Sequence, residues 1–232
     1  MKKLIIIPAY NETENIVRTI ENIKTNAPDF DYVIINDCST DDTLKKCLEH
    51  KYNVVSLPVN LGIGGAVQTG YLYGVRNGYD IAVQVDGDGQ HDAAFLHKMA
   101  EHLEKTGADM VIGSRFIEKK GFQSTGARRA GIKYFTGLIR LLTGVVVTDP
   151  TSGLRMVNRK VMEQFAKNYP KDYPEPETAV TVLMENLKIS EIPVIMRARE
   201  GGVSSISMKK SIYYMIKVSI AIVIERLRGR RV

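Results

Sequence analysis

The sequence predicts an α/β domain with a mainly parallel sheet and helices on both of its faces. Short apolar, β-branched runs alternate with helical patterns through the first half of the chain, and this alternation is typical of parallel sheets with crossover helices. Polar motifs follow several of the runs, where the strands would end, and open α/β sheets bind ligands at these carboxyl ends. With 232 residues, 44% of them hydrophobic, the chain can form one domain with a substantial core.

The elements follow from the spacing of apolar residues. Strands are expected at Leu4–Ile7, Tyr32–Ile35, Val54–Leu57, Ile81–Val85 and Asp109–Ile112. Helices are expected between them at 12–25, 41–50, 63–77 and 92–105. After Gly113 the alternation weakens, and the elements expected there are a loop at 115–127, helices at Arg128–Thr143, at 159–168 and from 177 to Leu187, and a strand at 189–197.

Two carboxylates follow the fourth expected strand. Asp86 and Asp88 are spaced so that a strand would point both side chains the same way. Gly87 and Gly89 allow a sharp turn and leave the carboxylates uncrowded. Hard oxygen ligands of this kind suit Mg²⁺ or Mn²⁺, which take one or two carboxylates plus substrate phosphates. A surface turn remains the alternative, because Asp-Gly pairs are common in turns.

Three more motifs occur ahead of this one, and the four together resemble the family 2 glycosyltransferases. The motifs are IIIPAYNE at 5–12, VIINDCSTDDT at 33–43, NLGIGGA at 60–66 and VQVDGDGQHD at 83–92. Members of that family are inverting enzymes of the GT-A fold that use sugar nucleotides. The Asp-x-Asp-x-Gln-His order is most similar to the polyprenyl-phosphate sugar synthases, the dolichol-phosphate mannose synthase group.

The resemblance implies a donor site with a divalent metal, Mg²⁺ or Mn²⁺, that neutralises the departing nucleotide. Asp88 is the main catalytic candidate, and the expected metal ligands are Asp86, Asp88 and Gln90. Asp37 is expected to accept a hydrogen bond from a uracil or guanine ring N–H, with uridine favoured, although the residues alone also allow an Asx-turn or a helix cap. The expected nucleotide-binding residues are Pro8, Ala9, Tyr10, Glu12, Asp37, Asn60, Gly62, Gly64, Gly65 and Asp86.

The acceptor side has two possible chemistries. A sugar hydroxyl needs a general base, normally Asp or Glu, whereas a lipid phosphate is already anionic and needs cations. Basic residues dominate 113–140, where Glu118 is the only acidic residue, and this surplus suits phosphate capture by arginine. The resemblance places acceptor phosphate at Arg115, Arg128, Arg129, Arg197 and Arg199.

A glycan hydroxyl acceptor stays open for two reasons. The carboxylates available as its base are Asp149, Glu177 and the neighbouring Glu175. The segment Tyr173–Glu177, with sequence YPEPE, also departs from the synthase pattern. A third alternative is an inactive subunit that binds a sugar nucleotide without turnover.

The positive charge lies in the tail. Residues 207–232 contain seven basic residues and one acidic residue, whereas the other 206 residues contain 25 of each. This distribution argues against a nucleic-acid-binding domain, which would spread basic residues over its folded face. We expect a transferase domain at 1–206 and an amphipathic tail helix at 207–232.

The apolar part of that tail, Ile212–Ile224, has 13 residues, and about 20 are needed to span a bilayer. The tail is therefore expected to lie on an anionic membrane surface, with Ile212, Met215, Ile216 and Val223 on one helix face. A small membrane protein or a second copy of the chain is the alternative partner.

These expectations combine into one hypothesis. The chain is expected to be a metal-dependent inverting glycosyltransferase that moves a sugar from a UDP-sugar to an undecaprenyl-type phosphate. Its alternative acceptor is a hydroxyl of a cell-wall or surface polysaccharide. Cys38 and Cys47 suggest no disulfide framework, and Lys2 and Lys3 lead directly into a strand without a signal-peptide pattern. The expected location is cytoplasmic, peripheral at the inner face of the cell membrane.

Overall fold

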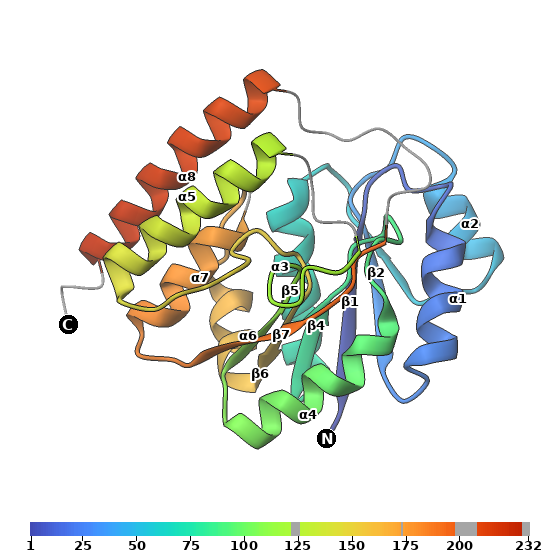
Figure 1. The fold of residues 1–232 in the computed structure, drawn as a ribbon. Coiled ribbons are helices and arrows are strands. Elements are labelled where there is room, and N and C mark those ends of the chain that lie inside the picture. The colour runs from blue at the N-terminus through green and yellow to red at the C-terminus, as the bar shows by residue number, and fades with distance from the viewer. Residues whose placement is uncertain (122–125, 173, 198–207, 229–232) are drawn as a thin grey trace.

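The computed structural model describes residues 1–121, 126–172, 174–197 and 208–228 (Figure 1). Within these residues the strands form one seven-stranded sheet in the order β3-β2-β1-β4-β6-β5-β7. The strands are β1 (Lys3–Ala9), β2 (Asp31–Asn36), β3 (Val54–Ser56), β4 (Ile81–Gln84), β5 (Met110–Ser114), β6 (Arg155–Asn158) and β7 (Ile189–Pro193). All pairs are parallel except those of β6, which runs antiparallel to β4 and β5. The predicted mainly parallel sheet is confirmed.

The helices also occur close to where the sequence predicts them. They are α1 (Ile16–Asn26), α2 (Thr43–Glu49), α3 (Gly62–Arg76), the 3-10 turn η1 (Ala93–Phe95), α4 (Leu96–Thr106), α5 (Gly126–Thr143), α6 (Arg159–Lys167), α7 (Pro174–Met184) and α8 (Met208–Arg228). Helix α7 begins three residues earlier than predicted, because proline fits the first turn of a helix, where N–H groups have no helical partner.

Strand β6 was not predicted. It lies after the point where the strand–helix alternation weakens, and it pairs antiparallel between β4 and β5. Asn158 ends it and caps the next helix, since Asn158 Oδ1 accepts the N–H of Val161 at 3.0 Å.

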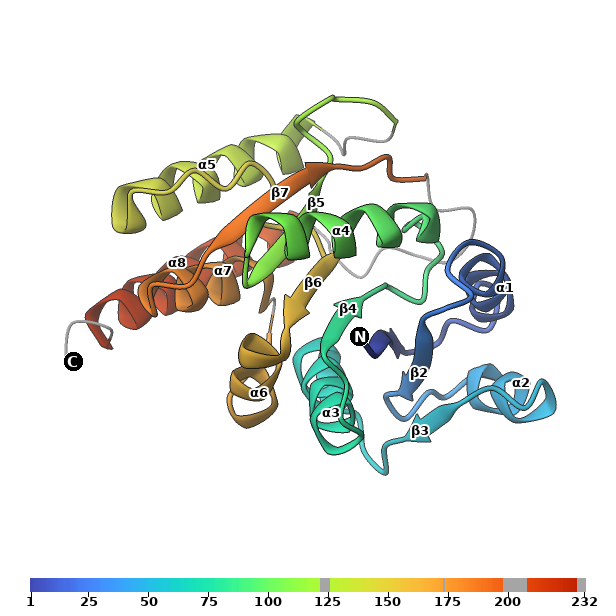
Figure 2. The same ribbon diagram turned by 90° about the horizontal axis from the view of Figure 1, so that it is seen from below.

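Helices cover both faces of the sheet, as predicted (Figure 2). Successive residues of β1 point to opposite faces, so that Leu4 and Ile6 belong to one core and Ile5 and Ile7 to the other. The first core includes residues of α3, α5, α6, α7 and α8. The second includes residues of α1, α2 and α4.

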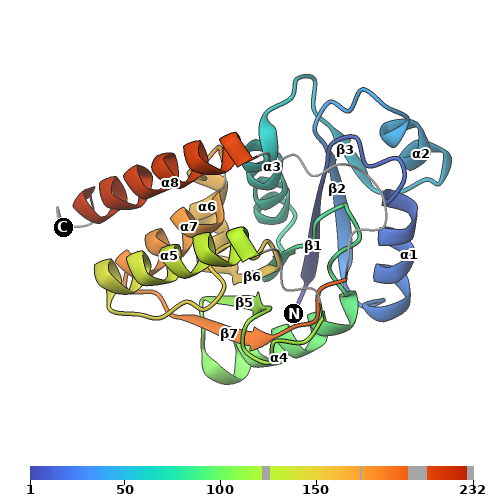
Figure 3. The same cartoon turned by 45° about the horizontal axis from the view of Figure 1, so that its top comes forward.

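The tail helix α8 lies beside α5 and α7 (Figure 3). It buries Val218 and Ile222 in the first core, and Met215 packs against the same core. Ile216 and Val223 are exposed. Of the predicted apolar face, Ile216 and Val223 are thus exposed, Met215 lies at its border with the core, and the Ile212 side chain is outside the described residues. In the part of the chain that the structure describes, no helix is long and apolar enough to cross a membrane.

Candidate active site

A pocket of about 430 Å³ lies where β1, β2 and β4 end at their carboxyl sides, within the usual size range of small-molecule sites. We call it the sheet-end pocket. Its described lining residues are Pro8, Ala9, Tyr10, Glu12, Asp37, Asn60, Gly62, Ile63, Ala66, Asp86, Gly87, Asp88 and Asp172. The fold thus brings most of the predicted nucleotide-binding residues into one cavity together with both predicted metal aspartates.

The charge of the sheet-end pocket is strongly one-sided. Five carboxylates and no lysine or arginine occur among the described residues that line it: Glu12, Asp37, Asp86, Asp88 and Asp172. Like charges repel at short range, so these side chains alone would disfavour a diphosphate. A divalent cation between the carboxylates and the phosphates would remove this repulsion.

A turn, not a strand, aims the two aspartates. Strand β4 ends at Gln84, so the pleat does not set the direction of Asp86 and Asp88, and that part of the prediction is wrong. The N–H of Gln90 donates to Asp88 Oδ1 at 3.0 Å, and Gln84 Nε2 donates to Asp86 Oδ1 at 2.9 Å. Among the described residues, no group of three or more His, Cys, Asp or Glu side chains is placed to hold a metal. Two carboxylates still fit Mg²⁺ or Mn²⁺, because substrate phosphates complete such sites.

His91 and Gly153 fix the surroundings of Asp86. His91 is buried, and its Nδ1 accepts the N–H of Asp86 at 3.0 Å. The neutral ring then has its proton on Nε2, which lies 3.8 Å from Asp86 Oδ2 and has no hydrogen-bond partner among the described residues. A Cβ on Gly153 would lie only 2.7 Å from Asp86 Oδ2. A side chain at position 153 would therefore displace the Asp86 carboxylate where residues 149–153, which we call the 149–153 turn, approach it.

Asp37 caps a helix that is distant in sequence. Its Oδ1 accepts the N–H of Leu61 at 2.7 Å, and its Oδ2 accepts the N–H of Gly62 at 2.9 Å. These are backbone donors at the start of α3, which lack partners within the helix. Each carboxylate oxygen can accept a further hydrogen bond, and Asp37 lines the pocket. Its contact with a nucleobase stays a prediction.

Gly64 and Gly65 are not among the lining residues of the sheet-end pocket, and their role in nucleotide approach stays a prediction. A Cβ on Gly64 would lie 2.0 Å from the carbonyl oxygen of Pro170, and a Cβ on Gly65 would lie 2.4 Å from Cβ of Leu61. Gly64 makes room for the chain near 170, and its N–H donates to the carbonyl oxygen of Lys171 at 3.1 Å. The next residue, Asp172, thereby reaches the pocket, although no local pattern marks it.

Gln90 is tied to the predicted acceptor residue Arg197. Gln90 Nε2 donates to the Arg197 carbonyl oxygen at 3.1 Å, and the Arg197 N–H donates to the Gln90 carbonyl oxygen at 3.0 Å. Gln90 does not line the pocket, so its predicted metal contact has no support in this arrangement. The Arg197 side chain pairs with Asp92 at 2.7 Å. Arg199 lies outside the described residues.

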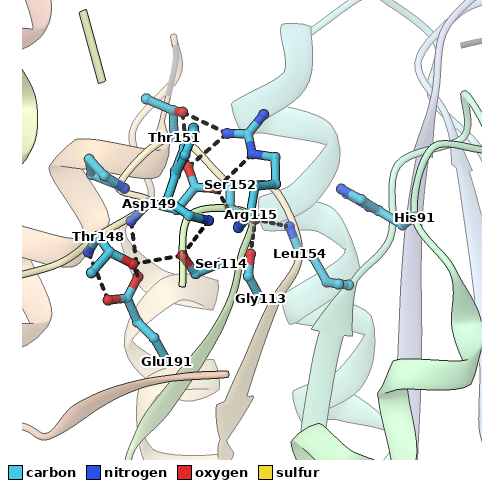
Figure 4. A network of polar contacts seen from close by, with 12 residues as sticks. His91, Gly113, Ser114, Arg115, Thr148, Asp149, Thr151, Ser152, Leu154 and Glu191 are labelled. Carbon is cyan, nitrogen blue, oxygen red and sulfur yellow. Dashed lines mark hydrogen bonds and ion pairs between the residues drawn. The ribbon is translucent and has the colours of Figure 1, made fainter. Parts of the chain in front are cut away.

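Asp149 holds Arg115 by a two-point contact (Figure 4). Arg115 Nε donates to Asp149 Oδ2 at 2.6 Å, and Arg115 Nη2 donates to Asp149 Oδ1 at 2.7 Å. The Asp149 side chain is fully buried and that of Arg115 is 12% exposed. A bidentate pair of this kind has a fixed geometry. The predicted acceptor residue and the predicted base are thus held against each other.

A buried network supports this pair from the protein side (Figure 4). Glu191 accepts the N–H groups of Thr148 at 2.7 Å and Asp149 at 3.0 Å. Burial raises the pKa of Glu191 above its usual range, and these hydrogen bonds oppose the rise. Ser114 Oγ lies 2.6 Å from Thr148 Oγ1. Residues from β5, β7 and the segment before β6 therefore fix the position of Arg115.

Glu175, in the first turn of α7, interacts electrostatically with Arg115 and Asp86. Burial raises the pKa of Glu175 to about 7, while Arg155 and Arg115 lower it and Asp86 raises it further. Glu177, the predicted catalytic residue, lies in the same first turn but does not line the sheet-end pocket. Arg128 and Arg129 lie exposed in the first turn of α5. Their predicted contact with acceptor phosphate stays a prediction.

The profile of glycosyl transferase family 2 matches residues 4–165 of this chain. The polyprenol monophosphomannose synthase of Mycolicibacterium smegmatis is 28% identical over 231 residues, covering 94% of this chain and 86% of the relative. The UDP-N-acetylglucosamine–dolichyl-phosphate N-acetylglucosaminyltransferase of Methanococcus voltae is 30% identical over 210 residues, covering 82% of this chain and 83% of that enzyme.

Solved structures share the fold. The glucosyl-3-phosphoglycerate synthase of Mycobacterium tuberculosis, crystallised with Mn²⁺, UDP-glucose and phosphoglyceric acid, superposes with a TM-score of 0.72. It is 20% identical, and the alignment covers 97% of this chain and 79% of that chain. The predicted GT-A architecture is confirmed.

Proposed function

Because this chain belongs to glycosyl transferase family 2 and is a glycosyltransferase, we propose that it moves a sugar from a nucleotide diphosphate donor to a polyprenyl phosphate. The reaction would be one in-line displacement at the anomeric carbon, with inversion. The observation that carries this proposal is the adjacency of two sites. The 149–153 turn links them, because its Asp149 holds Arg115 in a fixed orientation and its Gly153 lies against Asp86 of the acidic sheet-end pocket.

The sheet-end pocket would hold the donor. Tyr10, 48% exposed at the pocket, offers a ring face to the nucleoside, and Asp37 offers carboxylate oxygens to base or ribose donors. Uridine is the proposed base, supported by the UDP donors named for the Methanococcus relative and the Mycobacterium tuberculosis structure. Asp86 and Asp88 would hold Mg²⁺ or Mn²⁺, and the ion would neutralise charge on the departing diphosphate.

Arg115 would hold the acceptor phosphate. A phosphate oxygen is already anionic, so it can attack without losing a proton, and the protein needs only to hold and orient it. Two of the Arg115 N–H groups donate to Asp149 and one donates to Thr151 Oγ1, but a guanidinium has five N–H groups. Asp149 would act as the residue that orients Arg115. The names of the relatives support this acceptor, since two of them act on polyprenol or dolichyl phosphate.

One observation favours the alternative acceptor, a sugar hydroxyl. Glu175 has a pKa raised to about 7 by burial, a value that suits a general base near neutral pH. It also interacts electrostatically with both Asp86 and Arg115. A carboxylate so placed would serve a neutral hydroxyl better than an anionic phosphate.

The two acceptors can be separated with labelled nucleotide sugars. We expect transfer to undecaprenyl phosphate in detergent, giving an acid-labile lipid-linked monosaccharide, because the site orients an anion. Transfer to oligosaccharide hydroxyls with no lipid product would contradict the proposal and support the glycan alternative. A nucleotide sugar that binds without release of nucleoside diphosphate under either condition would indicate an inactive binding subunit.

We also propose that the protein docks on the inner face of the cell membrane through α5 and α8. No acidic residue occurs from 126 to 147, and Glu225 is the only acidic residue of α8. Exposed apolar side chains on these two neighbouring helices define what we call the α5–α8 surface: Tyr134, Leu141, Tyr213, Ile216, Ile220, Val223 and Ile224. An apolar surface with basic and few acidic residues suits anionic lipid, and it would keep the active site near a lipid acceptor.

The double variant Ile216→Ser/Ile220→Ser is expected to bind anionic vesicles at least about tenfold more weakly, because each side chain loses apolar burial worth about 1.5 kcal/mol or more. Both side chains are more than half exposed, at 58% and 55%, so folding should be little affected. Sedimentation with phosphatidylglycerol vesicles measures the change. The control Leu48→Ser/Val59→Ser removes similarly exposed side chains at 61% and 56% elsewhere and should bind like the parent. Equal binding by both double variants would exclude this surface.

A further inference from the structure

Arg155 is an arginine buried at the start of β6, with 1% of its surface exposed. Its Nε donates to the carbonyl oxygen of Ser152 at 2.7 Å, and its Nη2 donates to that of Pro150 at 2.7 Å. Its Nη1 donates to Thr178 Oγ1 at 2.8 Å and also to the carbonyl oxygen of Glu175. Arg155 therefore joins the 149–153 turn to the first turns of α7.

The buried charge of Arg155 needs compensation, because moving an ion out of water is costly unless hydrogen bonds or an opposite charge offset the lost hydration. The acceptors in these hydrogen bonds are all uncharged. Negative charge is nonetheless close: Arg155 and Asp86 both interact electrostatically with Glu175, whose pKa burial raises to about 7. In the sheet, Arg155 is also the direct partner of Gln84, which donates to Asp86. The buried cation thus lies between the two halves of the active site.

The 149–153 turn contacts both of these halves. At one end Asp149 holds Arg115 by two hydrogen bonds. At the other end Gly153 lies so close to Asp86 that a Cβ would overlap its carboxylate. Ser152 Oγ adds a 2.7 Å hydrogen bond to the carbonyl oxygen of Gly113, on the strand that precedes Arg115. A shift of this turn would therefore move Arg115 relative to Asp86.

We propose that Arg155 is a positioning residue that holds the 149–153 turn so that Arg115 and Asp86 face one shared space. It touches neither donor nor acceptor. Its function is to keep the Arg115 guanidinium, which would bind the acceptor, at a fixed position relative to the Asp86 carboxylate on the donor side. This role rests on the proposed transfer to a phosphate acceptor. A purely structural arginine would instead affect folding and both substrates alike.

The test compares Arg155→Lys with a matched control, Arg159→Lys. Lysine keeps the charge but cannot donate to all the carbonyl oxygens that the forked arginine side chain reaches. Arg159 also donates to two carbonyl oxygens, those of Tyr79 at 3.1 Å and Val75 at 3.2 Å, at the other end of the sheet. We expect Arg155→Lys to lower kcat/KM for undecaprenyl phosphate by about tenfold or more, since small misplacements of a binding group have large effects. UDP binding with Mn²⁺, measured by calorimetry, should stay within about threefold of the parent.

A spectroscopic readout makes the result independent of turnover. The Nε–H of Arg115, hydrogen-bonded to Asp149 at 2.6 Å, should give an arginine side-chain NMR signal protected from exchange and missing in Arg115→Lys. Arg155→Lys should weaken that protection, and Arg159→Lys should preserve it. Unchanged protection with unchanged acceptor kinetics would overturn the proposal, as would equal losses in UDP binding and acceptor transfer.

If Arg155→Lys does not fold, Thr178→Val decides the question. This change removes one Arg155 acceptor and keeps the side-chain shape at a buried position. The expected effect is a smaller loss in the same direction, with reduced protection of the Arg115 signal. A parent protein that shows the protected signal but no transfer to undecaprenyl phosphate would defeat the proposed function, while the protection of the Arg115 signal in the variants would still decide whether Arg155 holds the turn.

Discussion

Asp88→Asn is expected to lower the rate of nucleoside diphosphate release by on the order of 10³-fold, because a bound metal supplies several kcal/mol of charge stabilisation. The sheet-end pocket is lined by five carboxylates and, among its described lining residues, no basic side chain. A donor diphosphate bound here would therefore need a cation, and Asp88 is one of the two carboxylates that follow β4. Adding a chelator to the parent should have the same effect, and adding back Mn²⁺ or Mg²⁺ should reverse it.

The matched control for this experiment is Asp80→Asn. Asp80 lies at the opposite end of the same strand, with its side chain 58% exposed and its Oδ2 accepting the N–H of Lys2. Its loss should leave turnover within about twofold of the parent, as is usual for surface changes. Circular dichroism would verify that both variants are folded. Retained turnover in Asp88→Asn, or activity that survives complete chelation, would refute the metal assignment.

Asp149→Asn is expected to lower both stability and acceptor use. Breaking a buried ion pair by removing one charge costs about 3–5 kcal/mol of unfolding free energy, and Arg115 would lose its two-point contact. The Arg115 side chain is partly exposed, so we expect a loss near the lower end of this range. Urea denaturation measures it. The control Glu163→Gln breaks the exposed pair of Arg159 with Glu163 and should cost less than about 1 kcal/mol.

The kinetics of Asp149→Asn also separate two roles for this carboxylate. If Asp149 orients Arg115, the variant should raise the KM for undecaprenyl phosphate by about tenfold or more, because an acceptor-binding contact is misplaced. If Asp149 were a general base, kcat would fall with little change in KM. The second pattern, measured at saturating donor, would favour a hydroxyl acceptor and overturn the role proposed here.

The first half of the fold could be predicted from the sequence, because its signals are local. Strands and helices of that half alternate in hydrophobic pattern, and the motifs follow the strands where the sheet ends. Asp86, Asp37 and Tyr10 consequently appear together in the sheet-end pocket, as predicted. Periodicity within ten or fifteen residues is enough to set such elements.

Features that the sequence did not predict occur in both halves of the chain, and most of them involve contacts between distant segments. Strand β6 is four residues long and exists only because β4 and β5 flank it. The exposed and buried rows of α8 depend on where α7 and α5 lie. Gly64 packs against the backbone near 170, a contact that the sequence did not predict.

The amino-acid order by itself therefore determined the type of sheet, the edge where ligands bind and the acidic pair Asp86 and Asp88. Tertiary structure alone decided that Arg115 donates two hydrogen bonds to Asp149 and that Asp172 reaches the pocket. It also decided that Arg155 is buried and donates to the 149–153 turn. The reason is physical. Helix and strand patterns arise from neighbours in sequence, whereas a side chain's hydrogen-bond partners and burial arise from residues that only the folded chain brings near.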